Sequence, residues 1–422
     1  MTPDRMSASG TTSRRSALGM LSVIPLAASQ ALAPPGRAEA RSGSPSGPAP
    51  PWLRPGGAYD RFVRKLADED QFSGTVLLAW HGKPSLIRSY QTANKAAGIP
   101  NRADTIFALA SLTKFFTGLA VVQLAAAGKL NFYGTLGAYL NGFPPGVADT
   151  VTVHQLLTHT SGIADFMRSQ AWWKAADSWT TRAEAFDGTL AVLRRLPLDF
   201  TPGTRYAYSN SNYFLAGAVT ARASGQPYWD YLPRHVFTPA GMSSTGFYPG
   251  NQWLTDPRIA HNYGPRQTGG KRQDVTRELV MAGLPNGWDG AGGAFSSAVD
   301  LQRFALALQK GALLGGAWTE VAGNGKHPIS PAQQNPDQAP SQTTLIGYGT
   351  EERIVGGQRA FGHTGALGVP VKGSSIPGGG STSLSIYPNL GVVAVVLSNY
   401  FLYPGIGTFL REQDRIITRR RS

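Results

Sequence analysis

Strand-like and helix-like segments are distributed unevenly along the chain, and this distribution most limits the possible folds. Two short apolar runs that suit an antiparallel hairpin lie near the start, at 74–80 and 85–90. The stretch 150–285 mixes helical segments with Pro- and Gly-rich loops. Further strand candidates at hairpin spacing come near the end, at 347–355, 358–361, 382–387 and 392–398. Because both groups of strands need partners, we predict an α+β fold in which they share one sheet and a helical region is inserted between them.

Four helices are expected around these strands, and the first covers residues 58–67, where apolar residues recur at helical spacing. Residues 112–127 are almost continuously apolar and are followed by Gly128, which suits the end of a buried helix. Ser297 begins a capping-box pattern that predicts a helix reaching about residue 308. Residues 404–417 suit a closing helix, whereas 312–343, rich in Gly, Pro, Gln and Asn, are expected to form a loop.

The first 40 residues have the pattern of an export signal. Arg14 and Arg15 precede an apolar run of 16 residues from Ala17 to Leu32, which is shorter than the roughly 20 that a membrane-spanning helix needs. Small residues that suit signal cleavage follow the run, and the paired arginines suggest the twin-arginine route. We therefore expect residues 1–40 to direct the protein to the periplasm or the outside of the cell, with no stable membrane anchor.

A Ser-, Gly- and Pro-rich stretch follows this signal. Its composition, over residues 41–57, predicts a flexible linker. The folded domain is then expected to occupy residues 58–418.

The charge and the cysteine count exclude several classes of function. The net charge is +14, of which +3 lies within residues 1–50 and +3 within 411–422. The remaining cations are scattered, with no basic stripe interleaved with aromatic residues, so nucleic-acid binding is not expected. The chain has no cysteine, which excludes disulfides, thiolate metal sites and a cysteine nucleophile.

Ser111 and Lys114 form the strongest candidate for chemistry. Lys114 is the only lysine with a serine three positions before it. On a helix these two positions share a face, so the amine can reach the hydroxyl. A serine hydroxyl needs a base, and a desolvated lysine can lose its proton and serve as one. No nucleophile-elbow, H-E-x-x-H or phosphate-loop motif competes with this pair, and no metal or other cofactor is expected.

Two later motifs supply further polar groups. Tyr208 and Asn210 form a Y-x-N motif, and His363 begins the only H-x-G triplet. Gly365, the last residue of that triplet, would let a backbone approach a bound substrate closely.

These elements, in this order, resemble the serine β-lactamase and penicillin-binding-protein superfamily. The resemblance is closest to its class C-like branch, which includes esterases, D-aminopeptidases and D-alanyl carboxypeptidases. Residues 156–162 are similar to the L-L-x-H-T-S-G segment of that branch, and 290–300 to its A-G-G segment. Residues 361–365 and 392–399 are similar to its last strands, so the likeness spans roughly residues 70–400.

The resemblance implies a role for each candidate residue. Ser111 would be acylated by a substrate carbonyl, and Lys114 and Tyr208 would handle its proton. The sequence leaves open which of these two is the base, because both reference pKa values are near 10.

The remaining roles concern substrate binding. Asn210 would bind a substrate amide or hold Lys114, and His363 would contact the far side of the substrate or the tyrosine oxygen. The N–H groups of Ser111 and Ala366 would form an oxyanion hole.

The resemblance also implies an architecture. An antiparallel sheet flanked by helices would form an α/β lobe from about residues 58–115 and 285–418. A mainly helical lobe would occupy about 116–284, with the cleft between the two.

Two departures from the family pattern bear on specificity. Class C β-lactamases have lysine where this chain has His363, and a mostly neutral imidazole holds a β-lactam carboxylate less well. The connection from Leu367 to Gly380 is also longer than usual and would lie at the rim of the cleft. We therefore expect an exported serine hydrolase that cleaves an ester, an amide or a D-amino-acid peptide. The alternatives are a β-lactamase, or a penicillin or peptidoglycan-fragment receptor that does not turn over. The sequence does not indicate the oligomeric state.

Other histidine and tryptophan residues have simpler explanations. His154 and His159 are expected to be structural hydrogen-bonding groups. Trp172, Trp173 and Trp179 either line a cleft for a hydrophobic acyl group or belong to the core.

Overall fold

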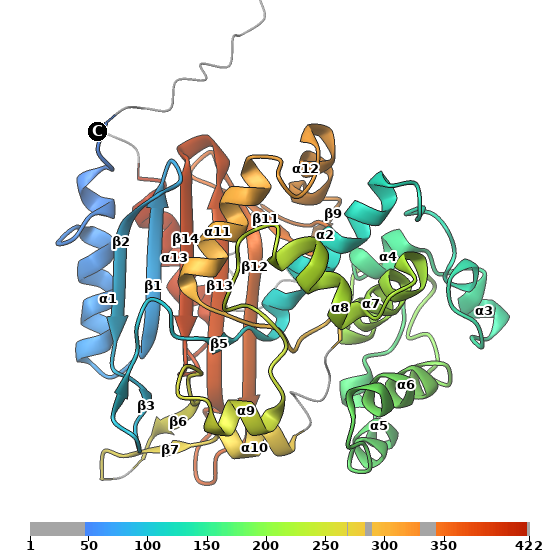
Figure 1. The fold of residues 1–422 in the computed structure, drawn as a ribbon, viewed down its shortest axis with the longest axis horizontal. Helices are drawn as coiled ribbons and strands as arrows, with labels where there is room; N and C mark the ends of the chain where they lie inside the picture. The colour runs from blue at the N-terminus through green and yellow to red at the C-terminus, as the bar shows by residue number, and fades with distance from the viewer. Residues whose placement is uncertain (1–46, 268, 283–288, 330–342, 420–422) are drawn as a thin grey trace, which may run out of the picture. The chain divides into compact units, whose positions relative to one another are not determined.

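One antiparallel sheet brings together strands from both ends of the domain. The computed structural model describes residues 47–267, 269–282, 289–329 and 343–419 (Figure 1). Strand β1 (Gly74–Trp80) pairs with β2 (Lys83–Tyr90) on one side and with β14 (Val392–Ser398) on the other. The predicted α+β fold with a shared sheet is therefore confirmed.

The sheet continues from β14 with strands late in the chain. Its order is β2-β1-β14-β13-β12-β11-β10-β9. The strands not yet named are β13 (Gly378–Tyr387), β12 (Gln358–Val369), β11 (Glu351–Val355), β10 (Thr343–Ile346) and β9 (His327–Ile329). All seven residues of β14 are buried, as expected for a central strand covered on both faces. A branch of β6 (Tyr263–Arg266) and β7 (Arg272–Asp274) attaches to β13.

Helices cover both faces of this sheet. Alternate residues of β1 point to opposite sides, so that Val76 and Leu78 belong to one core cluster and Leu77 to another. The first cluster packs against α1 (Ala58–Asp68) and α13 (Ile406–Ile417), and the second against α2 (Thr113–Ala126) and α11 (Ala298–Gln309). Eleven of the fourteen residues of α2 are buried, which explains why its sequence is apolar on all sides.

A group of mainly helical segments lies beside the α2 side of the sheet (Figure 1). Its helices are α3 (Pro145–Ala148), α4 (Val153–Leu157), α5 (Gln170–Ala176), α6 (Arg182–Leu193), α7 (Asn210–Ser224) and α8 (Tyr228–Leu232). Capping boxes begin two of them, at Thr152 for α4 and at Thr181 for α6.

The remaining elements are short. They are α9 (Gly250–Thr255), α10 (Thr276–Met281), α12 (Gly316–Gly323), and the strand pairs β3 (Thr92–Asn94) with β4 (Ile99–Pro100) and β5 (Phe107–Ala108) with β8 (Phe295–Ser296). The pair β5 and β8 joins the segment before α2 to the segment before α11.

The structure differs from the sequence prediction at several boundaries. The expected loop 312–343 contains α12 and β9, and the expected helical lobe 116–284 contains β6 and β7, which extend the sheet. β12 runs to Val369, because the long connection after it first continues the strand.

The folded part also begins before residue 58. Pro51–Leu53 form a short helical turn inside the expected linker 41–57, and Leu53 is buried in the cluster that contains α1 and α13. Burial of this one apolar side chain orders a segment whose composition alone indicated flexibility. The expected export signal, 1–40, lies outside the described residues, as does the linker up to residue 46.

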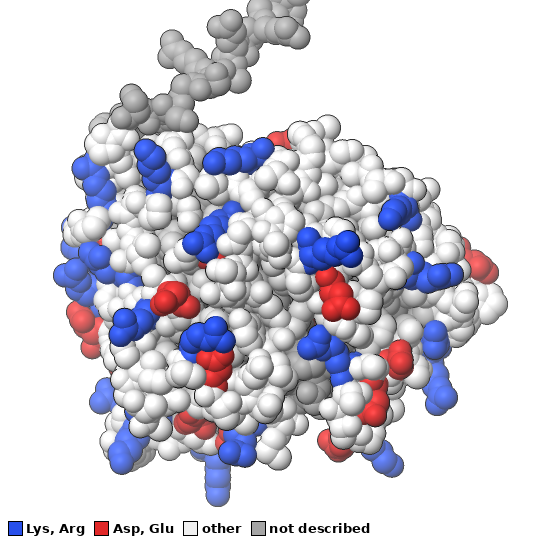
Figure 2. Space-filling model, viewed as in Figure 1, with Lys and Arg blue, Asp and Glu red and all other residues white. Residues whose placement is uncertain are grey.

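Charged side chains are dispersed over the visible surface. Figure 2 shows Lys and Arg spread across this face and interspersed with Asp and Glu. Within the described parts of the chain, none of the helices has the length and apolar character that crossing a membrane requires.

Candidate active site

A short helical turn, Ala110–Leu112, carries Ser111 at the entrance to α2. Two hydrogen bonds fix the backbone of Leu109, which directly precedes this turn. Its N–H donates to the Ala294 carbonyl at 2.9 Å, and its carbonyl accepts from Thr382 Oγ1 at 2.8 Å. Ala110, directly before the serine, has a left-handed backbone with φ of 50°. A non-glycine residue in this region is strained and persists only where its surroundings impose it. The hydroxyl of Ser111 is thus held in one position against the sheet.

Lys114 lies one turn further along and is completely buried. Its Nζ donates to Ser111 Oγ at 2.9 Å, to Asn210 Oδ1 at 2.9 Å and to the Ala291 carbonyl at 2.6 Å. Burial lowers the pKa of Lys114 to about 7, although the nearby carboxylate of Asp289 acts in the opposite direction. The amine can therefore lose its proton near neutral pH.

Tyr208 approaches the serine from the helical lobe. Its hydroxyl donates to Ser111 Oγ at 2.8 Å. Burial raises the pKa of Tyr208, and the hydrogen bond to Ser111 only partly opposes this shift. At neutral pH the phenol therefore keeps its proton and acts as a hydrogen-bond donor.

His159 holds Tyr208 in place. The two rings stack with centroids 4.4 Å apart, and His159 Nδ1 accepts the Ser209 N–H at 3.2 Å. Burial lowers the pKa of His159 well below its usual value, which keeps the ring neutral and leaves Nδ1 free to accept. His154 lies elsewhere, with its Nδ1 2.9 Å from the hydroxyl of Tyr348. Both contacts agree with the expectation of structural histidines.

Asn210, the first residue of α7, has its amide fixed from both ends. Its Oδ1 accepts from Lys114, and its Nδ2 donates to Asp165 Oδ2 at 3.0 Å. Since a carboxylate only accepts and the ammonium only donates, the orientation of this amide is determined.

The predicted residues of β12 lie at different depths. Gly365 packs against the turn that carries Ser111, and a Cβ there would lie 2.0 Å from the Leu109 carbonyl oxygen. Ala366 lines the same cavity as Ser111. His363 is 6% exposed, and among the described residues it is not part of the cavity lining.

His363 is also uncharged. Its Nδ1–H donates to the Thr364 carbonyl at 2.5 Å, and burial lowers the pKa of its ring to about 3, with the charge of Lys114 as the second cause. The structure therefore brings Ser111, Lys114, Tyr208 and Asn210 into one hydrogen-bonded group, whereas no hydrogen bond among the described residues joins the side chain of His363 to it.

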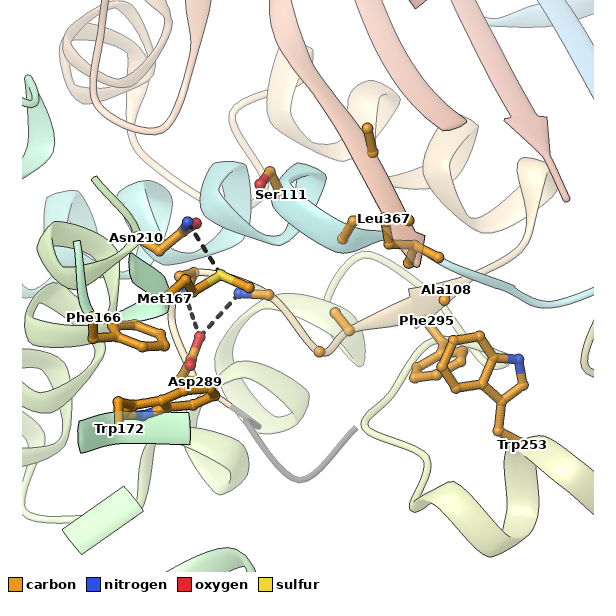
Figure 3. A pocket seen from close by; sticks show the side chains of 17 residues that line it. Ala108, Ser111, Phe166, Met167, Trp172, Asn210, Trp253, Asp289, Phe295 and Leu367 are labelled. Atoms are coloured by element: carbon orange, nitrogen blue, oxygen red, sulfur yellow. Dashed lines mark hydrogen bonds between the residues drawn. The ribbon is translucent and has the colours of Figure 1, made fainter. Parts of the chain in front are cut away.

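A cavity of about 300 Å³ opens in front of Ser111 and has two different ends (Figure 3). On one side of Ser111 the figure shows Phe166, Met167, Trp172 and Asp289. On the other side it shows Ala108, Trp253, Phe295 and Leu367. Leu367, the first residue of the segment that was expected at the rim of the cleft, lies within β12 and lines the cavity.

Several lining residues were missed by sequence reasoning. Asp289 directly precedes the Gly290-Ala-Gly-Gly segment, and this position was the one signal that could have drawn attention to it. Nothing in the local sequence distinguishes Phe166 and Trp253, which line the cavity, or Asp165, which accepts from Asn210, from ordinary residues. Trp172, for which two explanations were open, lines the cavity and packs in the core.

Within the described residues, no group of three or more His, Asp or Glu side chains is arranged to hold a metal ion. The chemistry available at this site comes from one serine hydroxyl, a lysine amine, a phenol and an amide. These groups suit proton transfer to and from a nucleophile.

Comparison with known proteins gives the family. The model of the Beta-lactamase family matches residues 59–417. Penicillin-binding protein 4* of Bacillus subtilis is 34% identical over 199 residues, 46% of this chain and 42% of that protein. Esterase EstB of Burkholderia gladioli is 35% identical over 195 residues, 44% of this chain and 50% of that protein. The chain thus spans about half the length of these curated relatives.

The fold has solved counterparts as well. A penicillin-binding protein from Bacillus halodurans is 27% identical, with a TM-score of 0.63 over 80% of this chain and 94% of that one. The fold and the family match agree with the resemblance identified from the motifs. The chain belongs to the Beta-lactamase family.

Proposed function

We propose that the chain is a serine hydrolase in which Ser111 attacks a substrate carbonyl and forms an acyl-enzyme. One observation carries this proposal. Ser111 Oγ is hydrogen-bonded to Lys114 Nζ at 2.9 Å and to the Tyr208 hydroxyl at 2.8 Å. A nucleophile within hydrogen-bond reach of a base that is itself oriented by a third group is the arrangement that covalent catalysis requires.

Lys114 is the proposed general base. Its pKa of about 7 places a large fraction of the amine in the neutral form at neutral pH. The neutral amine takes the Ser111 proton as the bond from Oγ to the carbonyl carbon forms. Tyr208, whose pKa is raised by burial, keeps its own proton and donates to Oγ. As the bond from the carbonyl carbon to the leaving group breaks, the leaving group takes the proton that Lys114 received from Ser111, and Lys114 becomes neutral again.

Two backbone N–H groups are proposed to stabilise the tetrahedral intermediate. Ser111 lies at the first turn of a helical segment, where N–H groups lack helical partners. Ala366 is exposed on β12 and lines the same cavity. Hydrogen bonds from these two groups would hold the oxyanion, and water would then release the acyl group with the same proton carriers.

The proposed substrates are esters, amides or D-amino-acid peptides. Because His363 is neutral, it supplies no cation for the carboxylate of a β-lactam. Esterase EstB, one of the relatives, supports an ester substrate. The second candidate is a β-lactamase, or a penicillin or peptidoglycan-fragment receptor that is acylated once, and it is favoured by the likeness to penicillin-binding protein 4*.

The test uses Ser111→Ala in the purified protein. Hydrolysis of p-nitrophenyl butyrate and labelling by a fluorophosphonate and by fluorescent penicillin are expected to disappear, while the thermal unfolding curve stays the same. Ser178→Ala, at an exposed helix-end serine, is the matched control and keeps full activity. If Ser111→Ala hydrolyses the ester at the wild-type rate, the assignment of the nucleophile is wrong.

Burst kinetics separate the two candidate functions. A hydrolase releases p-nitrophenol continuously after any initial burst, whereas a receptor releases one equivalent and then stops. Turnover of nitrocefin at a rate comparable to that of the esters would favour the β-lactamase instead.

Export is a separate proposal. The pair Arg14–Arg15 followed by the apolar run to Leu32 supports residues 1–40 as a twin-arginine signal that leads to the periplasm or the cell exterior. Fused to a folded reporter, these residues should export it, and changing both arginines to lysine should abolish export. Export that is unaffected by this double change would rule out the twin-arginine route.

A further inference from the structure

Asp289 places a buried carboxylate at one end of the active-site cavity. The residue is 6% exposed and lines the cavity. Its Oδ1 accepts the N–H groups of Ala291 at 2.7 Å and Gly292 at 3.0 Å. Within the described residues no hydrogen bond reaches Oδ2, so half of this carboxylate is available to a group inside the cavity.

Lys114 does not pair directly with this carboxylate. An ammonium has three donors, and those of Lys114 go to Ser111 Oγ, Asn210 Oδ1 and the Ala291 carbonyl. The charge on Asp289 is thus compensated only through space, and burial raises the pKa of its carboxyl to about 7. A cation that binds Oδ2 would stabilise the ionised form.

The walls around Asp289 also suit a cation. Phe166 and Trp172 line the same end of the cavity, with ring centroids 4.8 Å apart (Figure 3). Trp172 Nε1 donates to Thr189 Oγ1 at 2.9 Å, so its one polar atom is already satisfied by the protein. Aromatic rings near a desolvated site attract ammonium groups.

The opposite end of the cavity lacks this character. Its side chains are Ala108, Trp253, Phe295 and Leu367, and Trp253 Nε1 is bonded to the Ala260 carbonyl at 3.0 Å. None of these four side chains carries a charge. A substrate that spans Ser111 therefore meets one carboxylate-bearing end and one apolar end.

We propose that the end formed by Asp289, Phe166 and Trp172 binds a primary ammonium group of the substrate, so that the enzyme prefers amine-bearing esters or amides. This inference rests on the proposed acyl-enzyme function of Ser111. It adds a charge requirement that the nucleophile and its proton carriers do not impose.

The test compares pairs of substrates that differ only in an ammonium for a methyl group. On the acyl side the pairs are the p-nitrophenyl esters of 6-aminohexanoate against heptanoate and of 3-aminopropanoate against butyrate. On the alcohol side the pair is 6-aminohexyl acetate against heptyl acetate. In the wild type at pH 8, at least one of these pairs is expected to show a preference for the ammonium substrate. Its kcat/KM should exceed that of the matching methyl substrate about tenfold, as for one charge-assisted hydrogen bond.

Asp289→Asn is expected to reduce this ratio to about one. Because both members of a pair use the same base, any change in Lys114 cancels in the ratio. Asp177→Asn, at an exposed aspartate of the same helical lobe, is the matched control and keeps the wild-type ratio. Ratios near one for every pair in the wild type, or a ratio that survives in Asp289→Asn, would overturn the proposal.

Two further measurements test the ammonium site and the acyl-enzyme function separately. If Asp289→Asn does not fold, competitive inhibition of p-nitrophenyl butyrate hydrolysis by hexylammonium is compared with inhibition by hexan-1-ol in the wild type. Stronger inhibition by the ammonium supports the site, and equal inhibition overturns it. Failure of the acyl-enzyme function is recognised separately, since Ser111→Ala would then hydrolyse the neutral esters at the wild-type rate.

Discussion

The ring of His159 stacks on the ring of Tyr208, with centroids 4.4 Å apart and an angle of 28° between the planes. His159 also accepts the N–H of Ser209, so it fixes both the ring and the backbone beside it. In His159→Ala the phenol loses this support, and kcat is expected to fall about 10- to 100-fold, as for a small displacement of a catalytic group. The measurement is kcat and KM for p-nitrophenyl butyrate, with the larger change in kcat.

His159→Asn provides a conservative comparison. Asparagine tolerates the left-handed backbone of this position, where φ is 56°, and its Oδ1 can accept the Ser209 N–H. Part of the lost kcat should therefore return. His154→Ala, which removes a histidine outside the hydrogen-bonded group of Ser111, should keep the wild-type kcat. If His159→Ala and His154→Ala have the same kinetic effect, His159 has no positioning role.

The rate should depend on pH through the ionisation of Lys114. Since the neutral amine is the base and burial lowers its pKa to about 7, kcat/KM is expected to rise with pH through about 7 and then level off. His363, with a pKa of about 3, is neutral throughout this range, so His363→Gln should keep the same midpoint whatever its rate. A flat profile between pH 5 and 9 would contradict Lys114 as the base.

Asp289→Asn should move that profile. The Asp289 carboxylate is the strongest of the groups that raise the pKa of Lys114. Without this charge, burial lowers the pKa of Lys114 further. The midpoint of the pH profile, measured with a neutral ester, should therefore shift to lower pH. A shift to higher pH would mean that Asp289 does not act on Lys114 by its charge.

Much of the fold could be predicted from the sequence because the signals were local. The hairpin of β1 and β2, the apolar helix α2 and the last two strands follow from apolar runs bounded by turn residues. The misjudged segments owe their structure to distant contacts. Leu53 is ordered because it is buried near α1 and α13, and β9 forms because it pairs with β10. The local sequence around Leu53 or β9 does not show that these partners will be close.

The residues of the site also fall into two groups, those that sequence motifs predict and those that only the folded structure brings to the cavity. Ser111, Lys114 and Tyr208 lie in recognisable motifs, and the structure brings both Lys114 and Tyr208 within hydrogen-bond reach of Ser111. Asp289 and Phe166 enter the cavity through packing of segments far apart in the chain, so their environment exists only in the folded protein. The burial of His363 is likewise a property of the sheet and not of its H-x-G triplet.

Gly365 allows β12 to touch the turn that carries Ser111. A Cβ at this position would lie 2.0 Å from the Leu109 carbonyl oxygen and 2.4 Å from Thr382 Oγ1, and neither atom belongs to a flexible chain end. Gly365→Ala is therefore expected to lower the free energy of unfolding by about 1–3 kcal/mol and to reduce kcat, because the turn or the strand must shift. Gly146→Ala is the control, since its Cβ would meet nothing within 4 Å. Equal unfolding curves for the two variants would show that the contact is easily relieved.

A buried ion pair attaches α13 to the sheet. Arg353 of β11 donates from Nε to Asp414 Oδ2 at 2.8 Å and from Nη2 to Oδ1 at 3.0 Å, and the Tyr387 hydroxyl also donates to Asp414. Asp414→Leu leaves the guanidinium buried without its partner, so the free energy of unfolding is expected to fall by about 3–5 kcal/mol. The measurement is urea unfolding followed by tryptophan fluorescence.

The double variant Arg353→Met with Asp414→Leu should recover most of this loss. Two apolar side chains replace two desolvated charges, and such replacements of a buried pair are often neutral or stabilising. Glu412→Gln, which breaks the exposed pair with Arg415 on the same helix, should change the free energy of unfolding by less than about 1 kcal/mol. Because the buried pair lies on the face of the sheet covered by α13, away from the α2 face that carries Ser111, kcat should be unchanged in the double variant under conditions where it is folded. A double variant as unstable as Asp414→Leu would show that the ion pair itself, and not the unpaired charge, determines the stability of this attachment.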